Sequence, residues 1–451
     1  MLSYWNLHKI PILLVLGSII FYAVFAYDLQ REDFIKLLSL FAALFFLLVK
    51  IMQFEKWNFK FLLAAGILFR LVFLMATPNL SQDFYRFIWD GELMIQGINP
   101  YLFTPDQLIE SSEFLIRNSE ILHQGMGQLS ARHFSNYPPI NQFIFALSAF
   151  LGFGSIMGSI IWMRIFIILA DLGIVYFGRK LLLNNNQSPH MIFWYFLNPL
   201  VILELTGNLH FEGVMLFFFL WAMYLISTGK YLFAAPIYAA SIMLKLVPIL
   251  FLPLLLPFLK FKKSTLFYTA CALCCLLFLL PFYAPQFLQN YSQTVGLWFS
   301  NFEFNAGLYN LVKTIAVDFF EQKPWVLVKT YGKIVPILTI ITALTLMLFR
   351  NTKTMSSLLT SMVLLLTTYY FLSSTVHPWY LIFLLGLSVF TNYRFALVWS
   401  AAVVLSYFAY ANPDFTENLW LITIEYLLAF GYLGYEILKN RNILAPIRKK
   451  S

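Results

Sequence analysis

The sequence is poor in charged residues, which make up only 11% of its 451 positions. A soluble protein of ordinary composition carries about 25% charged residues, whereas 60% of this chain is hydrophobic. The composition excludes a soluble globular protein and indicates a protein that crosses the membrane many times. A phosphate-binding Walker sequence is missing too, which argues against an ATP-driven machine.

Cysteine is scarce as well. The three cysteines, Cys271, Cys274 and Cys275, lie in one apolar segment. Because no cysteine occurs in a segment expected to face outward, we expect no structural disulfide and interpret all three as small core residues. The chain also lacks polar linkers and any sizeable soluble part. We therefore expect residues 1–451 to form a single integral membrane domain.

What the chain does have is a series of apolar segments with the length or periodicity of membrane helices. They cover residues 10–27, 33–51, 61–77, 156–177, 190–206, 211–227, 231–243, 246–258, 264–282, 334–349, 356–374, 379–390, 395–410 and 420–438. We predict an all-α polytopic bundle of about 13 or 14 transmembrane helices. A further stretch, 141–153, is too short to cross and is expected to be re-entrant or interfacial.

The basic residues orient this bundle. With the N-terminus in the cytoplasm, most Lys and Arg residues fall in short cytoplasmic connections, as the positive-inside rule requires. The cluster at 260–263 stays inside only if residues 231–258 form two short helices that turn near Leu244 and Lys245, which several prolines favour. Both termini are then cytoplasmic, and two long segments, 78–140 and 283–333, face outward.

The first of these segments begins with a polar and aromatic stretch. Ser81 can cap a helix whose first turn holds Asp83. Asp83, Arg86 and Asp90 then share one helix face. Two interpretations remain open: an interfacial amphipathic helix in which Arg86 neutralises both carboxylates, or carboxylates with a chemical task, since acids near hydrocarbon are costly.

Other unusual polar and aromatic residues also fall on the outward side. Glu204, Asn208 and His210 occupy the outer end of one apolar segment, and His377 lies at the outer end of another. Lys245 sits at the predicted turn between two short helices. For the histidines and Lys245, an ordinary interface or snorkelling role is the simpler alternative.

The order of these pieces resembles a known family. The pattern DFYRFIWDG…GINPY…YPP, followed by NPL…E…GN.H, K.VP, FN.G.Y and VHPWY, is similar to bacterial GT-C glycosyltransferases. Within them it most resembles the multi-spanning polyprenyl-phosphate-mannose-dependent mannosyltransferases, and it is distantly similar to the mannosyltransferase of GPI-anchor synthesis. The resemblance covers about residues 60–390.

The resemblance implies a helical membrane bundle with amphipathic helices and a catalytic carboxylate in the first long outer loop. By position, Asp83 matches the general base and Asp90 the second acid. The sequence departs from the family in three places: its two acids are not a tight pair, Phe211 stands where a polar residue is common, and two extra spans precede the catalytic loop.

The residue types in these outward segments are also those that glycosyl transfer requires, independently of the family resemblance. Transfer from a lipid phosphate needs one general base, because phosphate leaves as a stable anion without a strong general acid. Cations are then needed to hold the phosphate. The expected substrate-binding residues are Arg86, Trp89, Tyr101, Tyr137, Glu204, Asn208, His210, Lys245 and His377. Among them Arg86, Lys245 and His377 are the phosphate candidates, and the aromatic residues could stack on sugar rings.

We therefore expect an inverting transferase in the inner (plasma) membrane, with its active site facing the periplasm. It would move a hexose, by resemblance mannose, from a polyprenyl phosphate to a glycan or lipid acceptor. No cofactor is certain, but Asp83 and Asp90 could hold Mg²⁺ or Mn²⁺. No nucleic-acid partner is expected.

Three alternatives stay open. A transporter or flippase for a lipid-linked sugar would show pseudo-symmetric halves and charges at mid-membrane. A surface-glycan polymerase or ligase would use a lipid diphosphate and should show more outward arginines. A non-catalytic scaffold of envelope assembly would tolerate replacement of its outer acids.

Overall fold

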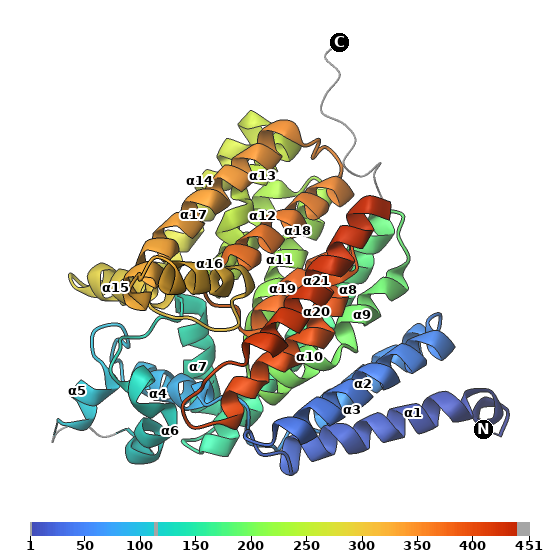
Figure 1. Ribbon diagram of the computed structural model, residues 1–451, viewed down its shortest axis with the longest axis horizontal. Helices are drawn as coiled ribbons and strands as arrows, with labels where there is room; N and C mark the ends of the chain where they lie inside the picture. The colour runs from blue at the N-terminus through green and yellow to red at the C-terminus, as the bar shows by residue number, and fades with distance from the viewer. Residues whose placement is uncertain (1, 112–115, 440–451) are drawn as a thin grey trace.

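The computed structural model describes residues 2–111 and 116–439. In those ranges the elements are all helices, and the only strand-like contact is an isolated bridge between Phe304 and Thr375. The prediction of an all-α polytopic bundle is thereby confirmed (Figure 1).

Within the described part of the chain, seven helices are long and apolar enough to cross a membrane. They are α1 (Leu2–Tyr27), α2 (Phe34–Glu55), α8 (Ile156–Asn184), α14 (Phe261–Leu279), α17 (Pro324–Phe349), α18 (Met355–Leu372) and α21 (Leu419–Lys439). The predicted span 334–349 thus begins ten residues earlier, at Pro324, because proline is favoured in the first helical turn and nothing before residue 334 breaks the helix.

The remaining apolar segments form shorter helices or pairs of short helices. They form α3 (Phe59–Leu71), α7 (Pro139–Leu151), α11 (Glu212–Ser227), α12 (Tyr231–Ile242), η3 (Val247–Phe251), α13 (Leu252–Leu259), η4 (Leu280–Phe282), η5 (Pro378–Tyr380), α19 (Leu381–Ser388), α20 (Phe395–Ala402) and η6 (Val403–Ala411). The break between α12 and η3 falls at residues 243–246, so the prediction of two short helices that turn near Lys245 is confirmed.

The predicted span 190–206 is not a continuous α-helix. It divides into η1 (Pro189–Ile192), α9 (Phe193–Phe196), α10 (Pro199–Val201) and the π-helix η2 (Ile202–Gly207). Proline lacks the amide hydrogen that an α-helix interior needs, and the chain bends by 111° between 199–207 and α11. Length and composition therefore give seven spans, or eight with this bent pair, where we predicted about 13 or 14.

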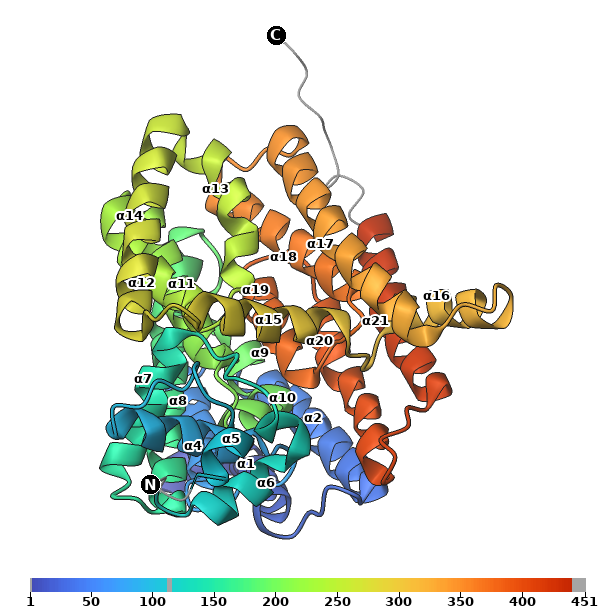
Figure 2. The ribbon, with the colours of Figure 1, turned by 90° about the vertical axis from the view of Figure 1, so that its left-hand side faces the viewer.

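Short helices gather at one end of the bundle, in a group that we call the outer layer. It contains α4 (Asp83–Ile95), α5 (Pro105–Ile109), α6 (Ser119–Ala131), α7, α15 (Phe287–Ser300) and α16 (Gly307–Asp318). In Figure 2, α15 and α16 run across the lower ends of α14 and α17, and α15 lies directly above α4–α7. The N-terminal end of α1 and the C-terminal end of α21 lie away from this layer (Figure 1).

Helix α4 forms where it was predicted, with Asp83 in its first turn, but its N-cap residue is Gln82 and not Ser81, and the Gln82 side chain makes no capping hydrogen bond. The hydroxyl of Ser81 accepts the Asp83 amide at 3.3 Å, and Gly97 (φ 74°) follows the helix end in the left-handed conformation that glycine favours. However, the helix buries the apolar side chains of Phe84, Ile88 and Leu93 inside the protein. It packs between α6 and α7 and is buried from Arg86 through Leu93.

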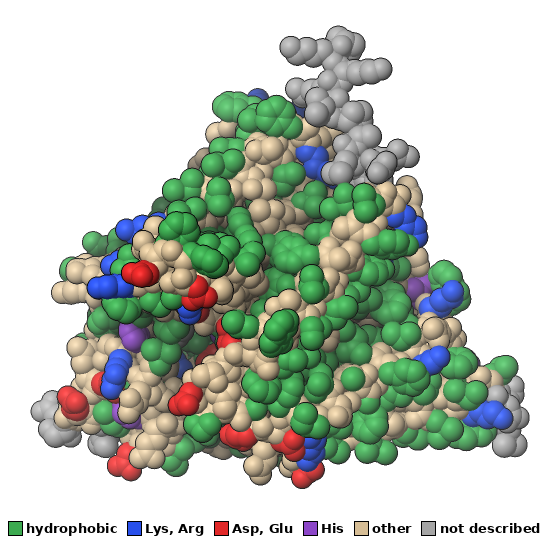
Figure 3. Space-filling view, in the orientation of Figure 1, with side chains coloured by type: hydrophobic (Ala, Val, Ile, Leu, Met, Phe, Trp, Pro, Cys, Tyr) green, Lys and Arg blue, Asp and Glu red, His purple; other side chains and the backbone are tan. Residues whose placement is uncertain are grey.

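Charged side chains divide the surface. On the face in Figure 3, acidic residues gather along the lower left and lower edge, over the outer layer and the α1–α2 turn. The right-hand and upper parts carry basic residues among hydrophobic ones. Large exposed apolar side chains such as Phe46, Leu277, Ile340 and Leu427 cover the helices between these regions. This is the surface expected of a protein embedded in lipid.

A fully buried ion pair joins α3 to α8. Arg70 Nε lies 2.8 Å from Asp171 Oδ2, and both side chains are inaccessible to solvent. Arg70 also donates to the carbonyl of Phe196 at 2.8 Å, and Tyr195 donates to Asp171 at 3.2 Å. With these bonds the two charges satisfy each other, so neither is left unpaired in the apolar interior.

We predict that Arg70→Met lowers the free energy of unfolding by about 3–5 kcal/mol, because it leaves Asp171 buried and unpaired. Unfolding in mixed detergent micelles measures this loss. The double variant Arg70→Met, Asp171→Leu should recover most of it. Lys36→Ala, which breaks the exposed pair with Asp28, should cost under about 1 kcal/mol. A double variant no more stable than Arg70→Met would contradict the explanation.

Candidate active site

Two segments far apart in the sequence meet at the boundary between the bundle and the outer layer. Asp83 occupies the first turn of α4, and His210 lies in the turn between η2 and α11. Their nearest side-chain atoms, Asp83 Oδ2 and His210 Nε2, are 3.8 Å apart. The Asp83 side chain is 40% exposed while that of His210 is only 4% exposed. Asp83 is therefore the member of this pair that a substrate can reach.

A buried carboxylate supports His210 from behind. Glu204, in η2, has Oε2 2.9 Å from His210 Nδ1. Tyr407, in η6, donates its hydroxyl to the other oxygen of Glu204. Glu204 thus fixes the ring of His210 and favours a proton on Nδ1 or on both ring nitrogens.

A second carboxylate nearby holds a cation. Glu212, the first residue of α11, forms an ion pair with the ammonium of Lys245. Glu212 is almost completely buried, whereas the side chain of Lys245 is 27% exposed. The ammonium also lies 5.2 Å from the centre of the Tyr380 ring. An ammonium group has three donors, so Lys245 is oriented by its partners yet able to bind a further anion.

A continuous stack of rings, which we call the ring stack, lines the site. His210 stacks on Trp379 with centroids 3.9 Å apart, and Trp379 stacks on His377 at 4.4 Å with only 3° between the planes. Phe304 follows at 4.8 Å and Tyr410 at a further 5.7 Å. The stack joins the second outer segment, 283–333, and the VHPWY motif to the turn that carries His210.

Backbone pairing positions the middle of the ring stack. Phe304 N donates to Ser374 O at 3.0 Å, and Val376 N donates to Phe304 O at 2.8 Å. Asn305 donates to Val376 O at 3.3 Å and to buried Glu425 at 2.9 Å. The FN.G.Y and VHPWY motifs are therefore adjacent in space, because each supplies one side of this short bridge.

The protonation states follow from the surroundings. Burial raises the pKa of Asp83, but the positive charge of His210, 3.8 Å away, and that of Lys245 outweigh it, so that the pKa ends below its ordinary value. Burial lowers the pKa of His377 to about 3 despite the nearby Asp83. Asp83 is thus ionised and His377 neutral at physiological pH. A neutral His377 can offer a hydrogen bond to a ligand but no positive charge.

A buried arginine holds the two halves of the site together. Arg164, in α8, donates Nη1 to the carbonyls of Leu74 and Ala76 at 3.0 and 2.8 Å. Its Nε and Nη2 donate to Thr206 O at 2.6 Å and Gly207 O at 3.1 Å. The first two carbonyls precede α4 and the second two end η2. One guanidinium therefore sets the separation of the segments that carry Asp83 and His210.

Asn208 has a positioning role as well. Its Oδ1 accepts the amide of Leu80 at 3.3 Å, and its side chain is buried. The contact links the stretch before α4 directly to the turn before His210. Asn208 was predicted as a substrate-binding residue, and the structure places it behind the site.

Arg86 and Asp90 form a separate cluster within the outer layer. Arg86 Nε lies 2.7 Å from Asp90 Oδ1, and Arg86 also donates to Ser130 O at 2.7 Å and His133 O at 3.0 Å. Ser135 donates to the other Asp90 oxygen at 2.6 Å. Arg86 and Asp90 are both buried. Their polar atoms bind the 130–135 stretch, and the structure does not bring them to His210 with Asp83.

The predicted aromatic residues are mostly buried too. Trp89 and Tyr101 have no exposed surface, and Tyr101 donates to Tyr137 O at 2.5 Å while packing on Phe282 of η4. Tyr137 is only half-buried, and burial together with the charge of Asp83 raises its pKa. Of these three residues, Tyr137 is the one near enough to Asp83 to contact a ligand.

The metal prediction receives no geometric support. Among residues 2–111 and 116–439, no group of three or more His, Cys, Asp or Glu side chains is arranged to hold an ion. The two acids predicted to share a metal, Asp83 and Asp90, have different partners. The residues present therefore do not fit a divalent cation held by that pair.

Sequence reasoning missed several residues that build the site. Arg164 had a usable signal, because a cation inside an apolar helix is costly unless it has a task. Tyr407 and Tyr410 had no such signal in the sequence, because aromatic residues are common in apolar membrane helices. Phe304 and its bridge to residue 375 depend on tertiary contact that sequence spacing does not show.

Two comparisons with known proteins bear on the chain. Residues 34–260, half of its length, match the family described as "Alpha-(1->6)-mannopyranosyltransferase, N-terminal domain". The chain is also similar to alpha-(1->6)-mannopyranosyltransferase B of Corynebacterium glutamicum, with 26% identity over 151 residues, which are 33% of this chain and 23% of that protein. The aligned part thus spans less than a quarter of the relative. The family match contains Asp83, His210 and Lys245, and the VHPWY motif lies beyond it.

We predict that Arg164→Gln loosens both halves of the site, because glutamine cannot supply all four hydrogen bonds. Hydrogen–deuterium exchange should accelerate by about tenfold or more in residues 74–83 and 206–212. Arg179→Gln, on the same helix but near its other end, is the matched control and should leave both peptides unchanged. Unaltered exchange in Arg164→Gln would show that the guanidinium does not hold these segments.

Proposed function

The chain belongs to the alpha-(1->6)-mannopyranosyltransferase family, and on that basis we propose that it transfers mannose from a polyprenyl phosphate to an acceptor hydroxyl at the outer face of the membrane. The observation that carries the proposal is a single exposed, ionised carboxylate, Asp83, beside a partly exposed cation, Lys245. These are the two groups that sugar transfer from a phosphate requires.

In the proposed reaction Asp83 is the general base. It removes the proton from the acceptor hydroxyl as that oxygen attacks the anomeric carbon, and the bond from that carbon to the phosphate oxygen breaks. One displacement without a covalent intermediate inverts the configuration. His210, held by Glu204, keeps Asp83 ionised until the proton arrives. A carboxylate with a lowered pKa is a weak base. Asp83 therefore accepts the proton late in the displacement, when the bond forming to the anomeric carbon has made the acceptor hydroxyl acidic.

The leaving phosphate would bind Lys245 and His377. Lys245 keeps donors free beyond its pair with Glu212, and the buried Nδ1 of His377 has no hydrogen-bond partner among the described residues. A neutral imidazole can donate one hydrogen bond to a phosphate oxygen. Arg86, the third predicted phosphate ligand, is engaged with Asp90. In this proposal Arg86 and Asp90 therefore position α4.

The proposed orientation follows from charge. On the face in Figure 3 the acidic side chains gather over the outer layer and the α1–α2 turn, together with some basic ones, whereas the right-hand and upper parts carry basic side chains among hydrophobic ones. By the positive-inside rule the basic end is cytoplasmic. This orientation places both chain ends in the cytoplasm and the site at the periplasmic face of a plasma membrane, where a polyprenyl-bound donor is accessible.

We predict that Asp83→Asn reduces kcat by about 10²–10⁴-fold, because general-base catalysis contributes that much, while donor binding stays within about threefold. Purified protein in lipid, given labelled polyprenyl-phosphate-mannose and an oligomannoside acceptor, provides the measurement. Asp106→Asn, an acid of the same outer segment that pairs with His123, is the control and should retain full activity. Full activity of Asp83→Asn would show that another acid is the general base.

The pH dependence gives a second test. Because the pKa of Asp83 is lowered, the base stays ionised down to or below the ordinary carboxyl value of about 4. The activity of the native protein should therefore fall only at that acidic limit. His210→Gln removes the main cause of the lowering, so the acid limb of kcat/KM should move to higher pH. His123→Gln should leave it unchanged, and an unmoved limb in His210→Gln would contradict the role of His210.

If the native protein moves the donor across the membrane of vesicles without consuming it, the protein is a sugar-lipid transporter and not a transferase. Equal consumption of donor by the native protein and Asp83→Asn would preserve the transferase and refute the base.

A further inference from the structure

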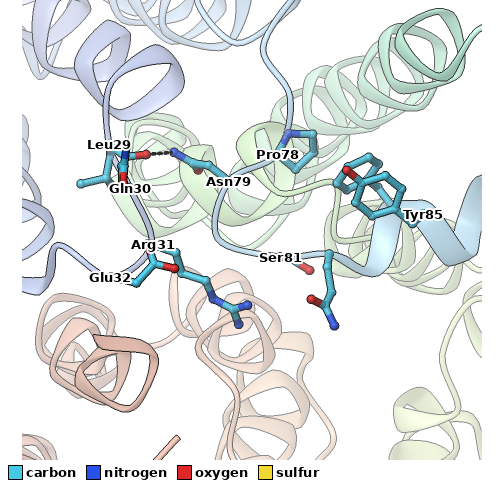
Figure 4. A pocket seen from close by; sticks show the side chains of 10 residues that line it. Leu29, Gln30, Arg31, Glu32, Pro78, Asn79, Ser81 and Tyr85 are labelled. Atoms are coloured by element: carbon cyan, nitrogen blue, oxygen red, sulfur yellow. Dashed lines mark hydrogen bonds between the residues drawn. The ribbon is translucent and has the colours of Figure 1, made fainter. Parts of the chain in front are cut away.

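A polar cavity opens beside the first turn of α4, on the side of the α1–α2 turn. Its volume is about 340 Å³, within the range of about 300–1,000 Å³ typical of ligand pockets. The lining residues are Leu29, Gln30, Arg31, Glu32, Pro78, Asn79, Ser81, Gln82, Phe84 and Tyr85. Figure 4 shows Arg31 reaching from the α1–α2 turn toward the stretch that contains Ser81, with Tyr85 at the far side. Three of these residues, 81, 82 and 84, flank Asp83 in the sequence.

One wall of the cavity comes from residues 28–33, between α1 and α2. This turn lies just before the family match, which begins at residue 34. Asn79 fixes it against the stretch before α4, because its Nδ2 donates to Phe25 O at 2.7 Å and Leu29 O at 3.0 Å. The second of these bonds is drawn in Figure 4. The N-terminal hairpin therefore completes a pocket next to the proposed base.

Arg31 connects this pocket to the site. Its guanidinium carbon lies 3.8 Å from the centre of the Tyr410 ring, the last member of the ring stack. A cation over an aromatic face is held in place by the ring quadrupole. Nε of Arg31 has no hydrogen-bond partner among the described residues. Arg31 is thus fixed in orientation, and as a residue of the cavity wall it brings the remaining guanidinium donors to a ligand, since its Nε is buried.

The lining indicates a neutral polyhydroxylated ligand. Arg31, Gln30 and Gln82 bring hydrogen-bond donors, Glu32 brings acceptors, and Tyr85 offers a ring face. The formal charges of Arg31 and Glu32 cancel. Sugar hydroxyls both donate and accept, so they match a mixed lining of this kind, whereas a lipid tail would require an apolar one.

A second cavity, of about 470 Å³, extends the first along the same turn. It shares Gln30 and Glu32 with the first cavity and adds Asp28, Asp33 and Lys36. Lys36 is already paired with Asp28 at 2.7 Å, which leaves Glu32 and Asp33 as carboxylates facing the space. Carboxylates repel an anionic ligand but accept hydrogen bonds from hydroxyl groups. The two cavities together form a polar trough for several sugar units.

From these observations we infer that the trough between residues 28–33 and the start of α4 binds the sugar units of a neutral oligosaccharide acceptor. The inference rests on the proposed transferase function and narrows its acceptor from a glycan or lipid to a glycan chain. The acceptor would approach Asp83 from the α1–α2 side, opposite Lys245. The turn before residue 34 would then decide which acceptor this chain uses.

The test is a binding titration of the full chain in lipid nanodiscs with α-1,6-linked mannotetraose, without donor. The native protein should bind it saturably, and Arg31→Ala and Glu32→Ala should each weaken binding about tenfold, the effect of losing one hydrogen bond that involves a charged group. Arg132→Ala removes an exposed arginine of the outer layer, bonded to Gln128, and should bind like the native protein. In the transfer assay, the acceptor KM should rise by the same factor while the donor KM stays constant.

The outcomes separate the two proposals. Equal mannotetraose affinity and acceptor KM in all four proteins, with transfer intact, would overturn the trough and leave the transferase standing. Absence of binding by the native protein up to millimolar oligosaccharide would also overturn it. Binding that depends on Arg31 and Glu32 in a protein that consumes no donor would retain the sugar site and refute the transferase.

Discussion

The guanidinium of Arg164 is the constraint on which the site depends. It gathers carbonyls from the stretch between α3 and α4 and from η2, two segments that do not complete regular α-helical hydrogen bonds. Unpaired carbonyls are costly in an apolar interior, and so is an unpaired cation. The hydrogen bonds between the guanidinium and the carbonyls remove both costs. They also make a rigid joint between the two segments, and Asp83 and His210 are directed toward each other from it.

This joint explains why the chemistry lies where the helices are irregular. A continuous helix through residues 199–227 would satisfy its own backbone and carry no turn at the boundary of the bundle. The π-helix and the 111° bend expose carbonyls that Arg164 then occupies. The same bend brings Glu204, His210 and Glu212 to one level, where a regular helix would distribute them around its axis.

Much of the fold could be predicted from the sequence because lipid burial imposes long apolar runs. The α12–α13 break was predictable from the prolines and from the position of the 260–263 basic cluster. The span count was not, since a run such as 190–206 has helical composition while its breaks are settled by tertiary partners. For the site, Asp83, His210 and Lys245 were found as unusual polar residues at apolar boundaries. The same signal selected Arg86 and Asp90, which the structure pairs with each other, because spacing alone cannot distinguish a reactive carboxylate from a structural one.

The Arg70–Asp171 pair also bears on how the protein enters the membrane. At 13 residues α3 is about 20 Å long, well short of the roughly 30 Å hydrocarbon core, and it carries a cation whose partner is made 101 residues later. Such a helix has no stable place in lipid by itself. It must remain in the insertion machinery or at the interface until α8 arrives, and by that point α4–α7 have already been made.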